Sequence, residues 1–259
     1  MKSQLSTDPL QPKPPAFHSR TDHILLDENS KVYKQLIHTK EYADTNMMKL
    51  NYKKTNLMIF NPCREIDFLP QFEIDENMLE VVEETRVLGL VVRSDLKWAS
   101  NTKNIVKKAY KRLWVIKRLK NLGACTNDLV DIYEKQVRSV VEFGVPVWQS
   151  SITQDERKNI ERIQKSFCKI VMAEKYTSYM QALEILSFKT LESRRVGLCL
   201  RFALKAEKHP KFQKWFKPST KSRNTRLKVP KYVPVFAHHA RFEKSPLSYL
   251  TSLLNDFYS

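Results

Sequence analysis

The residues best suited to chemistry lie in one short segment, NTKNIVKKAYKRLWVIKRLKNL (101–122), which holds eight cationic side chains and no acid. At about 100° per residue, four of these cations and a tryptophan fall on one side of a helix. Like charges four residues apart destabilise a helix slightly, so a partner of opposite sign is expected. Phosphates can supply that charge, and an indole can stack on a base or a sugar. We call these five residues the basic rail: Lys103, Lys107, Lys111, Trp114 and Arg118.

The same segment also predicts a core face. Apolar residues follow helical spacing on another side of it, at Ile105, Val106, Ala109, Leu113 and Ile116. A helix with one apolar and one basic face would pack on a core and leave its cations outward. The alternative is a merely solvated basic face with Trp114 turned into the core.

Composition limits the choice of partner. The chain has 259 residues, 42% of them hydrophobic, which is enough for a core. Its 45 Lys and Arg against 28 Asp and Glu give a net charge of +17, which favours nucleic acid first and an anionic membrane surface second. A bilayer-spanning run of roughly 20 apolar residues and an apolar signal segment are both missing from the sequence. We therefore expect no membrane partner and an intracellular protein, nuclear or cytoplasmic, that is not secreted.

Metal and nucleotide sites find little support. The four cysteines are scattered without a close Cys or His partner, so we expect all of them to be buried small hydrophobes and no metal site: Cys63, Cys125, Cys168 and Cys199. The four glycines form no phosphate-cradling loop, which excludes a P-loop or Rossmann enzyme. No cofactor is expected for this chain.

The first part of the chain predicts a disordered leader and a small α+β unit. Residues 1–29 are rich in proline and lack apolar periodicity. Within 30–98, helical spacing over 30–47 precedes an apolar strand at 55–60. Two β-branched runs within 78–94, separated by Glu83-Glu84, then indicate a hairpin.

The rest is predicted to be helical up to residue 208. Residues 126–128 and Thr153 are helix-capping types, and further helices are expected near 178–186 and 190–208. Helices joined by short loops form a bundle over 99–208. Residues 209–259 are basic and proline-punctuated, which predicts a flexible arm with at most a short terminal helix. The predicted fold class is α+β, mostly α.

Several segments together resemble the C-terminal part of a reverse transcriptase from non-LTR (LINE-type) retrotransposons. LNYKKTNLMIF (50–60) and ETRVLGLVVRSDLKW (84–98) are similar to the closing strand and hairpin of the palm. IYEKQVRSVVEFGVPVW (132–148), IERIQKSFCKIV (160–171) and LESRRVGLCLRFALK (191–205) are similar to the thumb and C-terminal segment. The resemblance implies that 30–98 is a partial palm and 99–208 a thumb-like bundle.

The resemblance also implies roles for single residues. Lys54 matches the palm lysine near the phosphates of the incoming nucleotide, and Thr55 matches its neighbour. Leu88 and Gly89 match the hairpin that grips the primer end. Without the resemblance, Lys54 would be a surface lysine before an edge strand, and Gly89 would mark a strand bulge.

The metal-binding carboxylates of that family are missing from this sequence. Such polymerases hold two Mg²⁺ ions on palm aspartates, including an adjacent pair, but the chain contains no Asp-Asp. Asp44 in Tyr42-Ala43-Asp44-Thr45 is followed by threonine and lies too close to LNYKKT, so we expect an exposed helical residue. The resemblance therefore implies a truncated, inactive fragment without catalytic residues that still binds an RNA template–DNA primer duplex.

Two alternatives remain open at this level. The chain could be an independent basic helical nucleic-acid-binding protein, or a decayed element copy without function. Arg194-Arg195 also allows two interpretations: a structural pairing with a carboxylate such as Glu161 or Glu184, or a phosphate contact.

Overall fold

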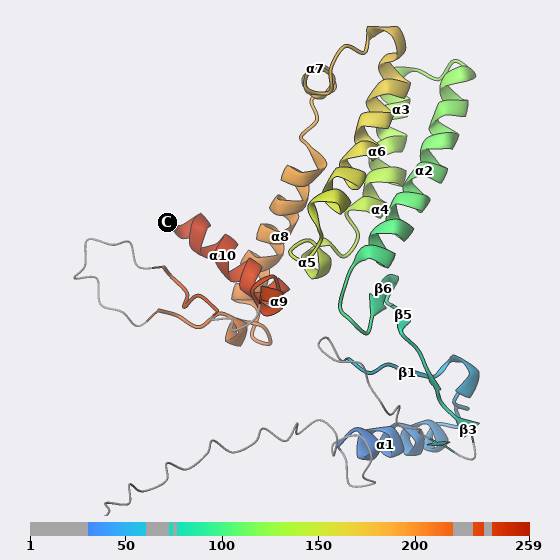
Figure 1. Cartoon of the computed structure of the whole chain (residues 1–259), viewed down its shortest axis with the longest axis vertical. Coiled ribbons are helices and arrows are strands. Elements are labelled where there is room, and N and C mark those ends of the chain that lie inside the picture. Colours follow the sequence, from blue (N-terminus) through green and yellow to red (C-terminus); the bar gives the residue numbers. More distant parts are fainter. Residues whose placement is uncertain (1–30, 61–72, 75–76, 220–229, 236–239) are drawn as a thin grey trace, which may run out of the picture. The chain divides into compact units, whose positions relative to one another are not determined.

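The computed structural model describes residues 31–60, 73–74, 77–219, 230–235 and 240–259. The chain forms two compact units, one of residues 1–57 and 65–81 and the other of residues 58–64 and 82–259. Figure 1 labels their α-helices and four of their strands. The fold is α+β and mostly α, as predicted. The predicted leader, 1–29, lies outside the described residues.

The smaller unit begins with α1, Lys31–Thr45, close to the predicted helix. Met47 ends it with a left-handed backbone (φ 53°), and the Met48 N–H donates to the Ala43 carbonyl at 2.8 Å, a standard helix C-terminus. Short elements follow: η1 (Tyr52–Lys54), β1 (Asn56–Leu57), β2 (Glu73–Ile74), β3 (Asn77–Met78) and β4 (Glu80–Val81).

Strand pairing in this unit is sparse. β1 pairs in parallel with β4, and β2 pairs antiparallel with β3. The predicted strand over 55–60 is shorter than expected, because only Asn56 and Leu57 are paired with a neighbour. Leu79 is buried against Leu36, Tyr52 and Leu57, which is a small core for a unit of this length.

The larger unit opens with the hairpin of β5 (Glu84–Val87) and β6 (Leu90–Arg93). Its turn is Leu88-Gly89, and both residues have positive φ (48° and 90°), as the two-residue hairpin turn requires. The predicted break at Glu83-Glu84 is therefore wrong, because Glu84 already pairs with Arg93 across the hairpin. The Val91 N–H donates to Asn101 at 3.2 Å, so the hairpin belongs to the unit that the helices form. The predicted boundary between the partial palm and the bundle was residue 98, whereas this unit takes in residues 82–98.

Helices make up the rest of this unit. In chain order they are α2 (Ala99–Asn121), α3 (Thr126–Ile132), the π-helical η2 (Tyr133–Arg138), α4 (Ser139–Val141), α5 (Val145–Trp148), α6 (Gln154–Met172), η3 (Ala173–Lys175), α7 (Tyr179–Ile185) and α8 (Leu191–Lys208). The predicted helices from Thr153, near 178–186 and over 190–208 are confirmed. Thr153, Ser178 and Thr190 each accept a backbone N–H of the first helical turn.

The cap of α3 differs from the prediction. Its N-cap is Cys125, whose Sγ accepts the Asp128 N–H at 3.4 Å, ahead of the predicted residues 126–128. Cys125 is exposed, so the prediction of a buried thiol is wrong there. Cys168 and Cys199 are buried as predicted, and burial raises their thiol pKa values to about 11 and about 12. Cys63 lies outside the described residues.

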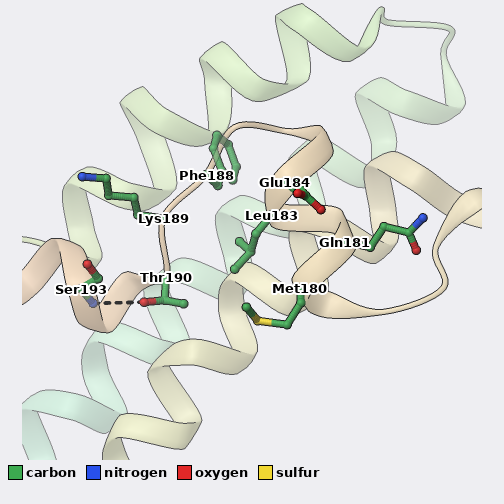
Figure 2. A pocket seen from close by; sticks show the side chains of 8 residues that line it. All are labelled: Met180, Gln181, Leu183, Glu184, Phe188, Lys189, Thr190 and Ser193. Carbon is green, nitrogen blue, oxygen red and sulfur yellow. Dashed lines mark hydrogen bonds between the residues drawn. The ribbon is translucent and has the colours of Figure 1, made fainter.

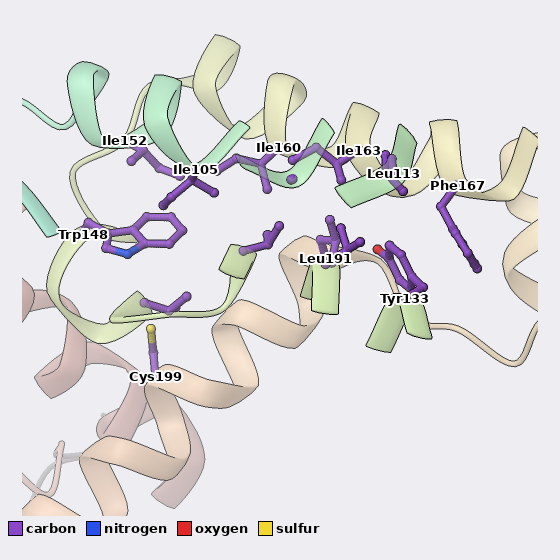
Figure 3. Packing of buried hydrophobic residues seen from close by; sticks show 14 of the residues in the cluster. Ile105, Leu113, Tyr133, Trp148, Ile152, Ile160, Ile163, Phe167, Leu191 and Cys199 are labelled. Carbon is purple, nitrogen blue, oxygen red and sulfur yellow. The ribbon is translucent and has the colours of Figure 1, made fainter. Parts of the chain in front are cut away.

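One apolar core joins these helices (Figure 3). Tyr133 stacks on Phe167 with ring centroids 4.0 Å apart, and its hydroxyl donates to Gln164 at 2.9 Å. Trp148 is fully buried and donates its indole N–H to the Phe143 carbonyl at 2.9 Å. Both buried polar tips are thus satisfied, as burial requires.

The C-terminal region packs on α8, which corrects the prediction of a flexible arm for its described residues. Phe216 and Tyr232 are buried in the core, and α10 (Pro246–Tyr258) lies along α8 after η4 (Gln213–Trp215) and α9 (Ala240–Glu243). Spacing of Leu250 and Leu254 by one helical turn gives α10 its buried face. Residues 220–229 of the predicted arm lie outside the described residues.

Candidate nucleic-acid interface

The basic rail lies on the outer face of α2. All five of its side chains are exposed, while Ile105, Ala109, Leu113 and Ile116 are buried on the opposite side, and Val106 is half-buried. Within the described part of the chain, no ion pair involves a rail cation: Lys103, Lys107, Lys111 and Arg118. The helix therefore presents a row of positive charge without internal compensation.

Trp114 belongs to this exposed row. Its side chain is 59% exposed, so the alternative that placed it in the core is wrong. The Arg118 guanidinium lies over its ring, 4.7 Å from the centroid. This cation–π contact holds an aromatic face and a positive charge side by side on the surface.

Two other cations of the same helix face neighbouring helices. Arg112 donates to the carbonyl of Gln136, which belongs to the π-helical η2. Lys120 donates to the Ile170 carbonyl and, at 2.5 Å, to the Val171 carbonyl at the end of α6. A positive side chain suits the Ile170 and Val171 carbonyls because the C-terminus of α6 carries partial negative charge. Of the eight cations of 101–122, two thus make internal contacts and four form the rail, while Lys108 and Lys117 are exposed outside both sets.

The residues matched to the palm lie in different units. Lys54 ends η1 in the smaller unit and is exposed, and the neighbouring Thr55 hydroxyl donates to the Asn51 carbonyl at 3.0 Å. Leu88 is 90% exposed at the hairpin tip of the larger unit. A Cβ on Gly89 would lie 3.2 Å from the Phe143 ring, so the glycine permits a close approach. Gly89 therefore lies in a hairpin turn and not at a strand bulge, the alternative considered from the sequence.

The paired arginines of α8 are structural, and their partners differ from those expected. Arg194 binds Glu142 through two hydrogen bonds of 2.6 and 3.3 Å, which raises the pKa of Arg194. Arg195 is fully buried and donates its Nε to Gln149 at 2.8 Å. Burial lowers the pKa of Arg195. Neither arginine hydrogen-bonds to Glu161 or Glu184.

Glu161 instead receives the start of α8. Its carboxylate accepts the N–H groups of Leu191 at 3.1 Å and Glu192 at 3.2 Å, together with the Tyr179 hydroxyl. Burial, followed by this hydrogen bond, raises the pKa of Tyr179. The α8 N-terminus is thereby already neutralised by an acid of the chain.

A hollow of about 640 Å³ lies beside this helix start, between α7 and α8 (Figure 2). Its wall contains Met180, Leu183 and Phe188, with Glu184 and Lys189 as its charged groups. Since Thr190 already accepts the Ser193 N–H, the hollow offers no cluster of reactive groups.

Sequence reasoning missed one further set of cations. Four exposed side chains follow helical spacing on α6: Lys158, Arg162, Lys165 and Lys169. The spacing of four, three and four residues was the signal that could have revealed them.

Other site types are not apparent in the described residues. Among these residues, no group of three or more His, Cys, Asp and Glu side chains is placed to hold a metal ion. Asp44 is exposed in the last turn of α1, as expected. Of the helices that the structure describes, none has both the length and the apolar character to cross a membrane.

The chain was compared with models of known families, with curated proteins and with solved structures, and nothing matches it significantly in any of the three.

Proposed function

We propose that the helical unit binds nucleic acid along the basic rail of α2, as a thumb-like part of a non-LTR retrotransposon reverse transcriptase. The observation that carries the proposal is the exposure of four cations and Trp114 on one helix face without a compensating acid. Phosphates would supply the missing charge, and the exposed indole would stack on a base or a sugar. The resemblance in sequence adds an RNA template–DNA primer duplex as the expected ligand.

An anionic membrane surface fits this helix less well. A helix that lies on a membrane inserts its apolar face between the lipids. The apolar face of α2 is already occupied, because Ile105, Ala109, Leu113 and Ile116 are in the core. An independent nucleic-acid-binding module, the alternative to a polymerase fragment, would use the same rail.

Salt titration of binding tests the proposal. Each phosphate contact releases about one condensed counterion, so four Gln substitutions at Lys103, Lys107, Lys111 and Arg118 should reduce the salt slope of log K by about 3 to 4 on duplex DNA. Trp114→Ala should weaken binding by about 1–3 kcal/mol if the indole stacks on the ligand.

A matched control separates the rail from general attraction to a protein of charge +17. The control variant carries four Gln substitutions at exposed cations on and just after α8: Arg201, Lys205, Lys208 and Lys211. Circular dichroism must show that both variants keep the helical content of the wild type. If the control loses as much slope as the rail variant, the rail has no special role and the proposal is wrong.

A further inference from the structure

The surface of α6 extends the rail to a second helix. α2 and α6 lie side by side in Figure 1, and the pairs Ile105 with Ile160 and Leu113 with Ile163 are neighbours in Figure 3. Further along both helices, Lys120 near the end of α2 contacts the last turn of α6, so successive positions of α2 meet successive positions of α6. The two helices therefore run parallel.

Both cationic rows lie on the same side of this helix pair. Lys120 marks the flank of α2 that faces α6, and the basic rail lies about 100–180° around the helix from it, with Lys103 and Trp114 nearest to α6. Ile170 marks the facing flank of α6, and Lys169 lies about 100° from it in the opposite sense. The rail is thus displaced in one rotational direction from the contact between the helices, and the α6 row in the other. Because the two helices run parallel, both rows then lie on the same outer face of the pair.

The other flank of α6 faces α7 and α8, and the four cations of the row remain exposed beside it. Gln164 donates to the Lys189 carbonyl at 2.9 Å, and Glu161 accepts from the first turn of α8. Lys165 and Lys169 lie over the rings of Tyr179 and Tyr176, with 5.0 and 5.6 Å between each ammonium and the ring centroid.

The other two cations of the row, Lys158 and Arg162, make weak polar contacts within α6. Arg162 donates to Asn159 at 2.8 Å, and Lys158 lies 3.7 Å from the exposed Asp155. Such contacts orient the side chains and leave most of their charge open to a ligand, because exposed pairs contribute little in water.

We propose that α2 and α6 together form a two-row cationic face that binds a double-stranded nucleic acid, with one phosphate backbone along each row. This inference rests on the proposed function and adds Lys158, Arg162, Lys165 and Lys169 to it. Packed helices lie about 8–10 Å apart, so two outward rows present charge over a width comparable with the grooves of a duplex, about 6 to 12 Å. A single strand has one phosphate backbone and would follow one row.

The experiment compares two probes on the full chain: a blunt DNA duplex and one of its strands alone. Gln substitutions at the four α6 cations should reduce the salt slope of log K by about 3 to 4 on the duplex and by at most about 1 on the strand. The α2 rail variant and the α8 control variant are titrated beside it, after circular dichroism has shown that each is folded.

The outcomes separate the two proposals. If the α6 variant keeps the wild-type slope on the duplex while the rail variant loses it, the second row is a solvated face and this inference is wrong. If neither variant loses more than the α8 control, the proposed function fails as well. Equal loss of slope on duplex and strand by the α6 variant would overturn the assignment of a double-stranded ligand.

Discussion

The positive side chains of this protein fall into two regions with opposite surroundings. Inside the bundle, Arg194 and Arg195 bind Glu142 and Gln149 and are mostly shielded from solvent. On the outer face of α2, Lys107 and Arg118 are exposed and form no ion pair with any acid that the structure describes. The comparison teaches that the first kind of cation should matter for folding and the second for binding.

Arg195 offers the strongest test of this division. Arg195→Ala should lower the free energy of unfolding by about 3–5 kcal/mol, because it leaves a cavity and an unpaired Gln149 in the core. Urea denaturation monitored by circular dichroism measures the loss.

A second variant separates packing from charge at the same position. Two terminal nitrogens of Arg195 and the amide nitrogen of Gln149 have no partner among the described residues. Replacing both side chains, Arg195→Met with Gln149→Leu, should recover most of the lost stability, because apolar groups of similar volume replace buried polar ones. A double variant as unstable as Arg195→Ala would contradict this account.

Arg194 should show a smaller effect. Arg194→Ala should lower the free energy of unfolding by about 1–3 kcal/mol, since it removes two charge-assisted hydrogen bonds and leaves Glu142 partly buried with the more distant Arg138. The matched control is Arg118→Ala on the rail, for which a change within about 0.5 kcal/mol is expected. Equal losses for the two arginines would erase the distinction between the regions.

The smallest expected effect is a pH dependence at the C-terminal region. Burial would raise the pKa of Glu207, but hydrogen bonds from Lys231, Tyr232 and Tyr258 outweigh it and lower that pKa. A depressed carboxyl pKa in the folded protein stabilises it above the unfolded pKa of about 4.3, and this contribution is lost as pH falls through the folded value.

Thermal unfolding measured from neutral to acidic pH should detect that contribution. Below about pH 4.3, Glu207→Gln should lose less unfolding free energy than the wild type, by on the order of 1 kcal/mol or less, and its melting temperature should fall less. Lys231→Met is the control that removes the strongest donor and should also weaken the pH dependence. If the melting temperatures of wild type and Glu207→Gln fall identically towards acidic pH, this network does not stabilise the fold.

Much of the fold could be predicted because local signals were strong. Helical spacing and capping residues located α2, α6 and α8, whereas the sequence left open whether Trp114 is exposed or turned into the core. The resemblance placed Leu88 and Gly89 on the hairpin, but the residue pattern did not locate the turn there, since Leu88 adopts a positive φ that leucine rarely takes. Its conformation is fixed by the pairing on either side of it and not by its own preference.

Contacts between distant segments were beyond reach of the sequence. The partner of Arg194 is Glu142, 52 residues away, and no local pattern distinguishes it from Glu161 or Glu184. The folding of the C-terminal region on α8 was likewise hidden by its many charges. Phe216 and Tyr232 are buried against residues that only the folded bundle brings together.

Two glycines of the larger unit have a consequence for tracing distant relatives. Gly89 and Gly144 both have positive φ. Each also lies close to the residue next to the other: a Cβ on Gly89 would approach Phe143, and a Cβ on Gly144 would lie 2.9 Å from Leu90. Substitution at either position would disturb both the backbone and the contact between the hairpin and the start of α5. Descendants of a common ancestor can exchange surface lysines freely, whereas this reciprocal pair tolerates almost no replacement. The two glycines should thus persist as a lineage marker after the charges have diverged.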